Sequence, residues 1–390
     1  MGNYTLDESS PEEDDGFMAW SKREYGKAEI DRMGALLVHW WRDLNAPEPE
    51  GTDEAYEVIQ NWRSSHGMPL LVFRGHLTKR AEKVSPNAIV AQRLKRLSSI
   101  MKKLVREPTM KLSQMQDLGG CRAIMPDMAS LNKLWELYRT TNDDFVQAEG
   151  GMKCYNYVQS PKADGYRGIH LVGRYKARAE KNEHWNGQRI EIQLRTKLQH
   201  AFSTAVETVT AFTRLPLKSG GGPADWRRFF SLVGTMFAIQ EGTPPVPDTP
   251  SDPAVLKIEL RRLMSSLRVR KRLRGWTQAL LLLPKKEMAD ARWILLVLDV
   301  AADSIQTTGF TDAKKAVQAV AAIEKSPEAA HLDAVLVGVN SIKSLGTAYP
   351  NYYADTAAFV SGLNKALHKS DGKRKKKQKR KRKTNDESQS

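Results

Sequence analysis

Arg189-Ile-Glu-Ile-Gln-Leu-Arg-Thr196 is the most regular stretch of the chain, because apolar and polar residues alternate along it without a break. This period of two residues predicts a β-strand with one buried face. The opposite face carries Glu191, Gln193 and Arg195, which could bind a metal ion or phosphate groups. Such a face is also ordinary at a protein surface, so its meaning depends on the residues around it.

The segment Asn156-Tyr-Val-Gln-Ser-Pro-Lys-Ala-Asp-Gly-Tyr-Arg-Gly-Ile-His170 lies upstream of this strand. Pro161 and Gly165 predict a bent loop, since proline fixes one backbone angle and glycine permits unusual ones. Within the loop, Lys162 could meet a phosphate and Tyr166 could stack on a base. The loop and the strand together indicate a nucleotide site, although Tyr166 and His170 taken singly could be structural residues.

Basic residues recur in the segment from Arg93 to Lys103. We expect an amphipathic helix over residues 91–106, on which Lys95, Ser99 and Lys103 would form one polar stripe. Such a stripe suits a triphosphate, and Arg93 at its end could stack on adenine. Taken alone, the stripe could equally be a solvated basic face.

Asp117-Leu-Gly-Gly-Cys-Arg122 precedes a second predicted strand. Its two glycines allow another group to approach the backbone closely. Asp117 is a hard oxygen ligand suited to Mg²⁺, and Arg122 could neutralise a phosphate. If Asp117 faces Glu191 across neighbouring strands, the two carboxylates predict a metal site.

The composition of the 390 residues is that of a soluble globular protein, with 41% hydrophobic and 27% charged residues. The two cysteines, Cys121 and Cys154, are too few for a disulfide framework or a four-cysteine zinc site, which favours a reducing cytoplasm. The acidic start, Asp7 to Asp15, does not resemble a signal peptide. No apolar run approaches the roughly 20 residues of a membrane span, so we expect no membrane contact.

The net charge of +16 is concentrated near the C-terminus, where Lys373 to Lys383 holds ten basic residues in eleven positions. Removing these ten charges leaves +6, which is ordinary for a cytosolic nucleotide-binding protein. Such a run repels itself and is expected to be unfolded. It could contact RNA in a salt-dependent way, or simply be a solvated tail.

Changes in composition predict five parts of the chain. They are an acidic flexible N-terminus (1–25), a first folded domain (26–240), a proline-rich linker (241–253), a small α/β domain of unknown role (254–367) and a basic disordered tail (368–390). The linker is the clearest boundary, because five prolines in the eleven residues from Thr243 to Pro253 cannot form a helix or a central strand.

Hydrophobic periodicity predicts the elements of both folded parts. Further helices are expected over residues 27–41, 53–63, 131–138 and 197–210, and a leucine-lined helix over about 256–272. Strands are expected over residues 121–125, 169–175, 189–194, 293–300 and 334–339, with a helical segment after each of the last two. The overall class is therefore α/β (α+β).

The order and spacing of the four polar segments resemble the synthetase domain of the RelA/SpoT-homologue family, the alarmone (p)ppGpp synthetases. The shared pattern is Arg-x-Lys-x-x-x-Ser-Ile-x-x-Lys, Asp-Leu-x-Gly-x-Arg, Pro-Lys-x-x-Gly-Tyr-x-x-Ile-His and Glu-Ile-Gln-x-Arg-Thr. The resemblance covers roughly Phe73 to Val209. It implies a nucleotidyltransferase-like fold, in which a mixed sheet is flanked by helices.

The resemblance also implies a role for each matching residue. ATP would be held by Arg93, Lys95, Ser99 and Lys103, with Arg122 beside its phosphates. Asp117 and Glu191 would be the catalytic carboxylates and would bind Mg²⁺, and Glu191 would act as general base. The acceptor nucleotide would be bound by Lys162, Asp164, Tyr166, His170, Gln193 and Arg195.

The implied reaction moves the β,γ-pyrophosphoryl group of ATP to the ribose 3′-OH of GDP or GTP. The chain contains no His-Asp dipeptide of the kind found in the family's hydrolase domain, so a synthetase without hydrolase activity is expected. Like other small synthetases of the family, the chain could form a homo-oligomer.

The acceptor remains open at this point, because the sequence departs from the family pattern in the acceptor loop, at Asn156, Asp164 and Gly168. One alternative is a toxin-like relative that pyrophosphorylates the 3′ end of tRNA or makes adenosine alarmones. Another is a nucleic-acid-binding regulatory protein with a vestigial catalytic domain. The intact Asp117 and Glu191 argue against that last alternative.

Overall fold

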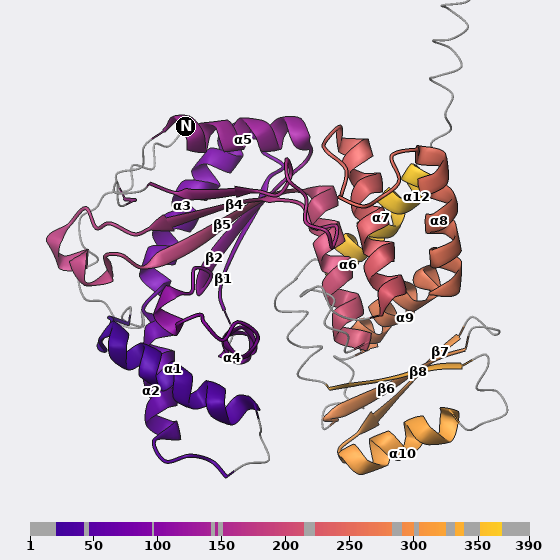
Figure 1. The fold of residues 1–390 in the computed structure, drawn as a ribbon, viewed down its shortest axis with the longest axis horizontal. Coiled ribbons are helices and arrows are strands. Elements are labelled where there is room, and N and C mark those ends of the chain that lie inside the picture. The colour runs from indigo at the N-terminus through magenta and orange to yellow at the C-terminus, as the bar shows by residue number, and fades with distance from the viewer. Residues whose placement is uncertain are drawn as a thin grey trace, which may run out of the picture.

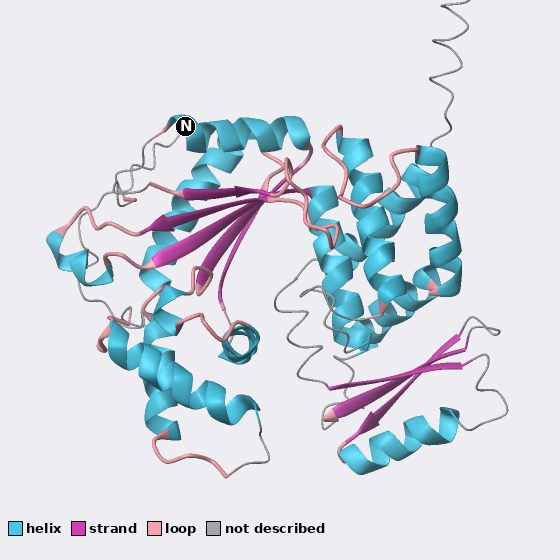
Figure 2. Cartoon of the chain, in the orientation of Figure 1, coloured by secondary structure: helices cyan, strands magenta, loops and turns pink. Residues whose placement is uncertain are grey.

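A computed structural model describes residues 21–42, 47–95, 97–141, 145–146, 151–213, 223–282, 291–299, 304–324, 332–338 and 352–368. These residues form a five-stranded sheet with its helices, a group of further helices beside it, and a separate three-stranded sheet (Figure 1). Figure 2 shows the same arrangement by type of element. Residues 1–20 of the expected acidic N-terminus and residues 369–390 of the expected basic tail lie outside the described residues.

The helices are α1 (Lys27–Arg42), α2 (Thr52–Ser64), α3 (Gly67–Val84), α4 (Leu97–Arg106), α5 (Met128–Thr140), α6 (Lys197–Thr213), α7 (Ala224–Glu241), α8 (Pro253–Ser266), α9 (Val269–Leu282), α10 (Ala313–Glu324) and α12 (Tyr352–His368). Short 3₁₀ turns are η1 (Leu112–Gln114) and η2 (Glu180–Trp185). The strands are β1 (Ile89–Leu94), β2 (Gly119–Met125), β3 (Lys153–Asn156), β4 (Ile169–Arg174), β5 (Arg189–Thr196), β6 (Trp293–Asp299), β7 (Ser304–Phe310) and β8 (Leu332–Gly338).

The five-stranded sheet has the order β1-β2-β5-β4-β3, with β5 at its centre. β5 pairs in parallel with β2 and antiparallel with β4, so the sheet is mixed. In this register Glu191 lies beside Gly120 of β2, and Gln193 lies beside His170 of β4. Three segments that are distant in sequence are thereby brought next to one another.

The two faces of β5 have different surroundings, as its alternating sequence predicts. Ile190, Ile192 and Leu194 are almost completely buried in a cluster formed with α3 and α5. Burying apolar surface of this kind is the main stabilising term of a fold. The prediction of a mixed sheet flanked by helices is confirmed.

Two further apolar clusters position the helices around the site. α1, α2 and α4 pack together through residues such as Ile30, Ile59 and Ile100. α6, α7, α8, α9 and α12 form the largest cluster, which includes Phe229, Leu260 and Phe359. None of the helices in the described residues is both long and apolar enough to cross a bilayer.

The large cluster contains residues from both sides of the proline-rich segment, which has no helix or strand between Thr243 and Asp252. The segment is itself packed, since Val246 is buried and its backbone N–H donates to Thr235 Oγ1 at 2.9 Å. The division of the chain at this segment stays a prediction. The helices on its two sides nevertheless share one core.

The structure corrects four expectations about secondary structure. Residues 91–94 belong to strand β1, so the helix expected over 91–106 begins only at Leu97. The pairing of β1 with β2 decides this, and such pairing cannot be seen in local periodicity. The leucine-lined helix is interrupted between α8 and α9, where Arg268 has a positive φ of 49°. The next described element after β6 is the antiparallel strand β7 instead of a helix. The elements α3, β3, α7 and β7 were not expected.

The loop between β3 and β4 is held against α7 by close backbone contact. Gly165 has a φ of +90°, and a Cβ atom there would lie 2.4 Å from the Phe230 carbonyl oxygen. The facing residue on α7 is also a glycine, and a Cβ on Gly234 would lie 2.6 Å from Gly165 Cα. Ser231 Oγ donates to the Ala163 carbonyl at 2.5 Å. Only glycines allow this approach, so α7 fixes the position of the loop.

Glu241, at the end of α7, adds a buried polar contact to the same loop. Its carboxylate accepts hydrogen bonds from Arg167 of the loop, Thr196 at the end of β5 and Gln199 of α6. Arg167 is 3% exposed, and burial lowers the pKa of its guanidinium while the carboxylate opposes that shift. A buried cation is tolerated only when it is paired in this way.

We predict that Gly165→Ala lowers the free energy of unfolding by about 2 kcal/mol or more, because it adds backbone strain and a clash with α7. Urea unfolding followed by circular dichroism would measure the change. Gly75→Ala in α3 is the matched control: nothing lies within 4 Å of its added Cβ, so a stabilisation of about 0.5–1 kcal/mol is expected. Equal effects of the two substitutions would contradict the role assigned to Gly165.

Candidate active site

A cleft of about 540 Å³ lies against the polar face of β5. Residues of β1, β2, β4 and β5 line it, together with residues of α4, α6, α7 and the loop before β4. All of the site residues expected from the sequence line this one cleft: Arg93, Lys95, Ser99, Lys103, Asp117, Arg122, Lys162, Asp164, Tyr166, His170, Glu191, Gln193 and Arg195. The four motif segments therefore meet in space.

Asp117 is bound by two lysines of the basic segment. Lys95 Nζ donates to Oδ2 at 2.6 Å, and Lys103 Nζ donates to Oδ1 at 3.0 Å. Lys95 follows strand β1, whereas Ser99 and Lys103 lie one turn apart on α4. The expected single helical stripe is therefore wrong, yet the strand end and the helix bring the same side chains to the same wall of the cleft.

The charges in this cluster depend on one another. Burial alone would raise the pKa of Asp117, but Lys95 and Lys103 lower it to about 2. Burial lowers the pKa of Lys95, and Asp117 opposes that shift. Asp117 is thus a carboxylate at all physiological pH values, held by two cations that an anionic ligand could draw away.

Five side chains form a closed ring of hydrogen bonds on the polar face of the sheet. His170 Nδ1 donates to Glu191 Oε1 at 2.7 Å, and Gln193 Nε2 donates to Glu191 Oε2 at 2.7 Å. Arg195 Nη2 donates to Gln193 Oε1 at 2.7 Å and to the Tyr166 hydroxyl oxygen at 2.9 Å. The Tyr166 hydroxyl closes the ring by donating to His170 Nε2.

The ring keeps Glu191 ionised and Tyr166 protonated. Burial, the largest effect, would raise the pKa of Glu191, but the hydrogen bonds from His170 and Gln193 oppose it and the pKa is lowered. Asp117 acts in the opposite direction, so the two carboxylates are close enough to repel each other. Burial raises the pKa of Tyr166. Glu191 can therefore accept a proton or bind a cation.

The loop before β4 brings aromatic and cationic groups to the far wall of the cleft. Lys162 Nζ lies 4.4 Å from the centre of the Tyr157 ring and 5.5 Å from that of Tyr166. Asp164 Oδ1 accepts from the backbone N–H of Tyr166 at 2.9 Å, which is the contact that shapes the turn. Asn156, one of the departures from the family pattern, accepts from two backbone N–H groups of the same loop.

Several cleft residues were not expected from the sequence. Lys102 and Arg106 extend the basic face of α4. Each follows a predicted site residue, Ser99 or Lys103, by three residues, and this helical spacing could have predicted that they lie on the same face. Four more belong to β1 and β2: Ala91, Gln92, Gly120 and Cys121. Another six belong to α6 and α7, where no local pattern marks them: Phe202, Ser203, Val206, Glu207, Arg227 and Phe230. They reach the cleft only through tertiary packing.

The donor atoms present suit a magnesium ion shared with a ligand. Among the described residues there is no group of three or more His, Cys, Asp or Glu side chains that could hold a metal ion by themselves. Mg²⁺ commonly binds through one or two carboxylates together with substrate phosphates and water. Asp117 and Glu191 match that chemistry, because both line the cleft and both are ionised.

The cleft combines the carboxylates of Asp117 and Glu191 with several lysines and arginines and the basic helix α4, and this distribution of charge suits phosphorylated ligands. Residues 92–212 match the family model described as "Region found in RelA / SpoT proteins". This match confirms, for residues 92–212, the resemblance seen in the motifs. None of the curated proteins matches the chain significantly.

Solved structures of bacterial synthetases are similar to part of the chain. Small alarmone synthetase 1 from Bacillus subtilis, bound to its product pppGpp, is 20% identical, with a TM-score of 0.38, over 45% of this chain and 89% of its own. Small alarmone synthetase 2 from the same organism is 15% identical, with a TM-score of 0.38, over 47% and 94%. A GTP pyrophosphokinase family protein from Streptococcus pneumoniae is 20% identical, with a TM-score of 0.36, over 48% and 88%.

The ion pairs of Asp117 predict an acid-dependent stability. Its pKa falls from 3.8 to about 2 on folding, which corresponds to about 2 kcal/mol. Because folding lowers this pKa, the stabilisation is present above about pH 4 and is lost as the pH falls toward 2. Urea unfolding between pH 6 and 2 should show that Asp117→Asn flattens this part of the profile.

The control for this prediction is Glu136→Gln, which removes an exposed carboxylate on α5 outside the cleft. It should leave the difference in stability between pH 4 and pH 2 unchanged. A wild-type profile that matches that of Asp117→Asn over this range would contradict the assignment.

Proposed function

We propose that the chain is a pyrophosphotransferase that uses ATP to pyrophosphorylate the ribose 3′-OH of GDP or GTP. The bond between the 3′ oxygen and the β-phosphorus forms, the bond between that phosphorus and the α,β-bridging oxygen breaks, and AMP leaves. The observation that supports this most strongly is the meeting of all four motif segments in one cleft of the RelA/SpoT region.

The basic wall of the cleft would hold the donor. Lys95 and Lys103 would turn from Asp117 to the ATP phosphates, with Arg122 and the α4 residues beside them. Asp117, freed of its two lysines, would then be a ligand of Mg²⁺. The metal would neutralise the charge that develops on the transferred group.

Glu191 would take the proton from the acceptor hydroxyl. It lies between the basic wall and the loop before β4. The hydrogen bond from His170 fixes the orientation of its carboxylate. Glu191 would also share the metal ion with Asp117. General-base catalysis of this kind contributes roughly 10²–10⁴-fold to a rate.

The acceptor loop would bind the purine nucleotide. The base would stack on the ring of Tyr166, whose position is set by the hydrogen bonds from Arg195 and to His170. Lys162 would meet the acceptor phosphates, while Asp164 and Gln193 would complete the wall. Asp164, which accepts a hydrogen bond within the turn, is also a departure from the family pattern, so several acceptors are compared in the assay.

We predict that Glu191→Gln lowers turnover at least about 10²-fold, because the amide cannot accept the proton. Purified protein with γ-labelled ATP and Mg²⁺ would be offered GDP, GTP, ATP and deacylated tRNA separately, and Glu136→Gln would be the matched control. Full activity of Glu191→Gln would contradict its role. Transfer of label to tRNA alone, or to ATP acting alone as the acceptor, would show that the acceptor is not a guanine nucleotide. Absence of transfer to any acceptor would contradict the proposed activity itself.

Tyr166→Ala should raise the KM for the acceptor about 10- to 100-fold and change the KM for ATP little, since stacking on a base is worth about 1–3 kcal/mol. Steady-state kinetics with each substrate varied in turn would separate the two constants. Tyr155→Ala removes a half-exposed tyrosine outside the cleft and should leave both constants unchanged. An equal rise in the KM for ATP would argue against an acceptor-specific role.

A further inference from the structure

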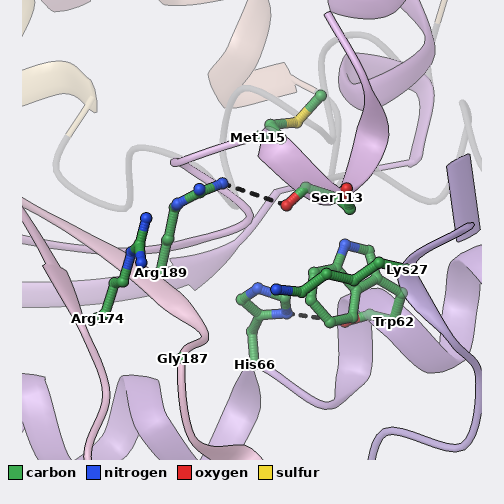
Figure 3. Close-up of a pocket in the computed structure, with 8 residues that line it drawn as sticks. All are labelled: Lys27, Trp62, His66, Ser113, Met115, Arg174, Gly187 and Arg189. Carbon is green, nitrogen blue, oxygen red and sulfur yellow. Dashed lines mark hydrogen bonds between the residues drawn. The ribbon is translucent and has the colours of Figure 1, made fainter. Parts of the chain in front are cut away.

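A second pocket, of about 200 Å³, lies at the opposite end of the β4–β5 pair from the Tyr166 loop. Figure 3 shows that α1, the turn between α2 and α3, the segment around η1 and the strand pair each contribute a side chain to it. The proposed reaction uses none of these residues. Three of them are cations: Lys27, Arg174 and Arg189.

The two arginines lie directly opposite each other across antiparallel strands. Like charges in this position destabilise a sheet unless something neutralises them. Burial lowers the pKa of Arg189, and the charge of Arg174 lowers it further. No carboxylate pairs with Lys27, Arg174 or Arg189 in the part of the chain that the structure describes, and the nearby Asp31 is bound to Ser113.

Two buried polar atoms of the same pocket have no hydrogen-bond partner among the described residues. Trp62 is 4% exposed and His66 is 1% exposed, yet Trp62 Nε1 and His66 Nε2 are both unpartnered. A buried donor or acceptor without a partner costs about 1–3 kcal/mol, so such atoms call for an explanation. Both residues border the space between the cations (Figure 3).

The protonation of His66 defines what its free nitrogen can do. Nδ1 lies 2.7 Å from the Trp62 carbonyl oxygen, which can only accept, so Nδ1 carries the proton. Burial is the main reason that the pKa of His66 is lowered to about 4, and Arg189 adds to the effect. At neutral pH Nε2 is therefore an acceptor, and it would complement a ligand that supplies a hydrogen as well as negative oxygens.

We propose that this pocket binds hydrogen phosphate, either as the free ion or as the terminal phosphate of a nucleotide. Arg174, Arg189 and Lys27 would bind its negative oxygens, and the Trp62 indole N–H would donate to one of them. The remaining P–OH would donate to His66 Nε2. Arg189 of this pocket and Glu191 of the cleft are two residues apart on the same face of β5. Their backbone positions are therefore separated by about 7 Å along the strand.

The indole N–H of Trp62 provides a direct readout that does not depend on activity. In protein labelled with ¹⁵N-tryptophan, its resonance would be assigned by its loss in Trp62→Phe. Titration with inorganic phosphate should shift it saturably with a Kd of about 1 mM or lower. Sulfate has no proton to donate to His66 at neutral pH, so it should bind at least about fivefold more weakly.

The variant Lys27→Gln/Arg174→Gln removes two exposed cations and should weaken phosphate binding at least about tenfold without unfolding the chain. Lys133→Gln/Arg139→Gln on α5 removes the same charge elsewhere and should leave the titration unchanged. Lys103→Gln should also leave it unchanged, which separates this pocket from the cleft. A titration with AMP in place of phosphate distinguishes the free ion from the terminal phosphate of a nucleotide. Tighter binding of AMP than of phosphate would identify the ligand as a nucleotide.

Three outcomes would overturn the proposal. They are a Trp62 resonance that does not move with either phosphate or AMP, equal affinities for phosphate and sulfate, and an unchanged titration in Lys27→Gln/Arg174→Gln. Each of them is independent of pyrophosphate transfer, so loss of the proposed reaction and loss of this site are distinguishable.

Discussion

The parallel pairing of β2 with β5 is the constraint on which the rest of the site depends. It places Gly120 beside Glu191 and so brings the Asp117 turn close to the polar face of β5. Strand β4 then pairs with the other edge of β5 and adds His170. Because the apolar face of the same strand is buried against α3 and α5, a shift of one residue in register would exchange core and site.

Parts of this arrangement could be predicted from the sequence because they depend on local rules. The alternation along β5 gave both its buried and its polar face, and the motif spacing identified the residues that meet in the cleft. Strand β1 could not be recognised in this way. The helical periodicity of α4 continues backward through Arg93 and Leu94. The pairing that makes these two residues a strand joins them to Gly120 and Gly119 of β2, which lie 27 and 25 positions further along the chain.

The helices that follow residues 92–212 show more clearly that local sequence patterns do not predict tertiary contacts. Phe230 and Arg227 of α7 line the cleft, and Gly234 allows α7 to touch Gly165, but nothing near these residues in sequence connects them with a nucleotide loop. The proline-rich segment suggested a separation at this point. That division stays a prediction, while α6 and α7 share one apolar cluster with α8, α9 and α12.

The triple contact of Glu241 has a consequence for how the chain can be divided. Its partners are Arg167, Thr196 and Gln199, all of which belong to the segment 92–212, whereas Glu241 itself lies beyond that segment. A fragment cut to the family boundaries would lack the counter-charge of Arg167, and breaking a buried ion pair in this way typically costs about 3–5 kcal/mol. The segment 92–212 is thus smaller than the structural unit to which it belongs, and a fragment intended to fold would have to include α7.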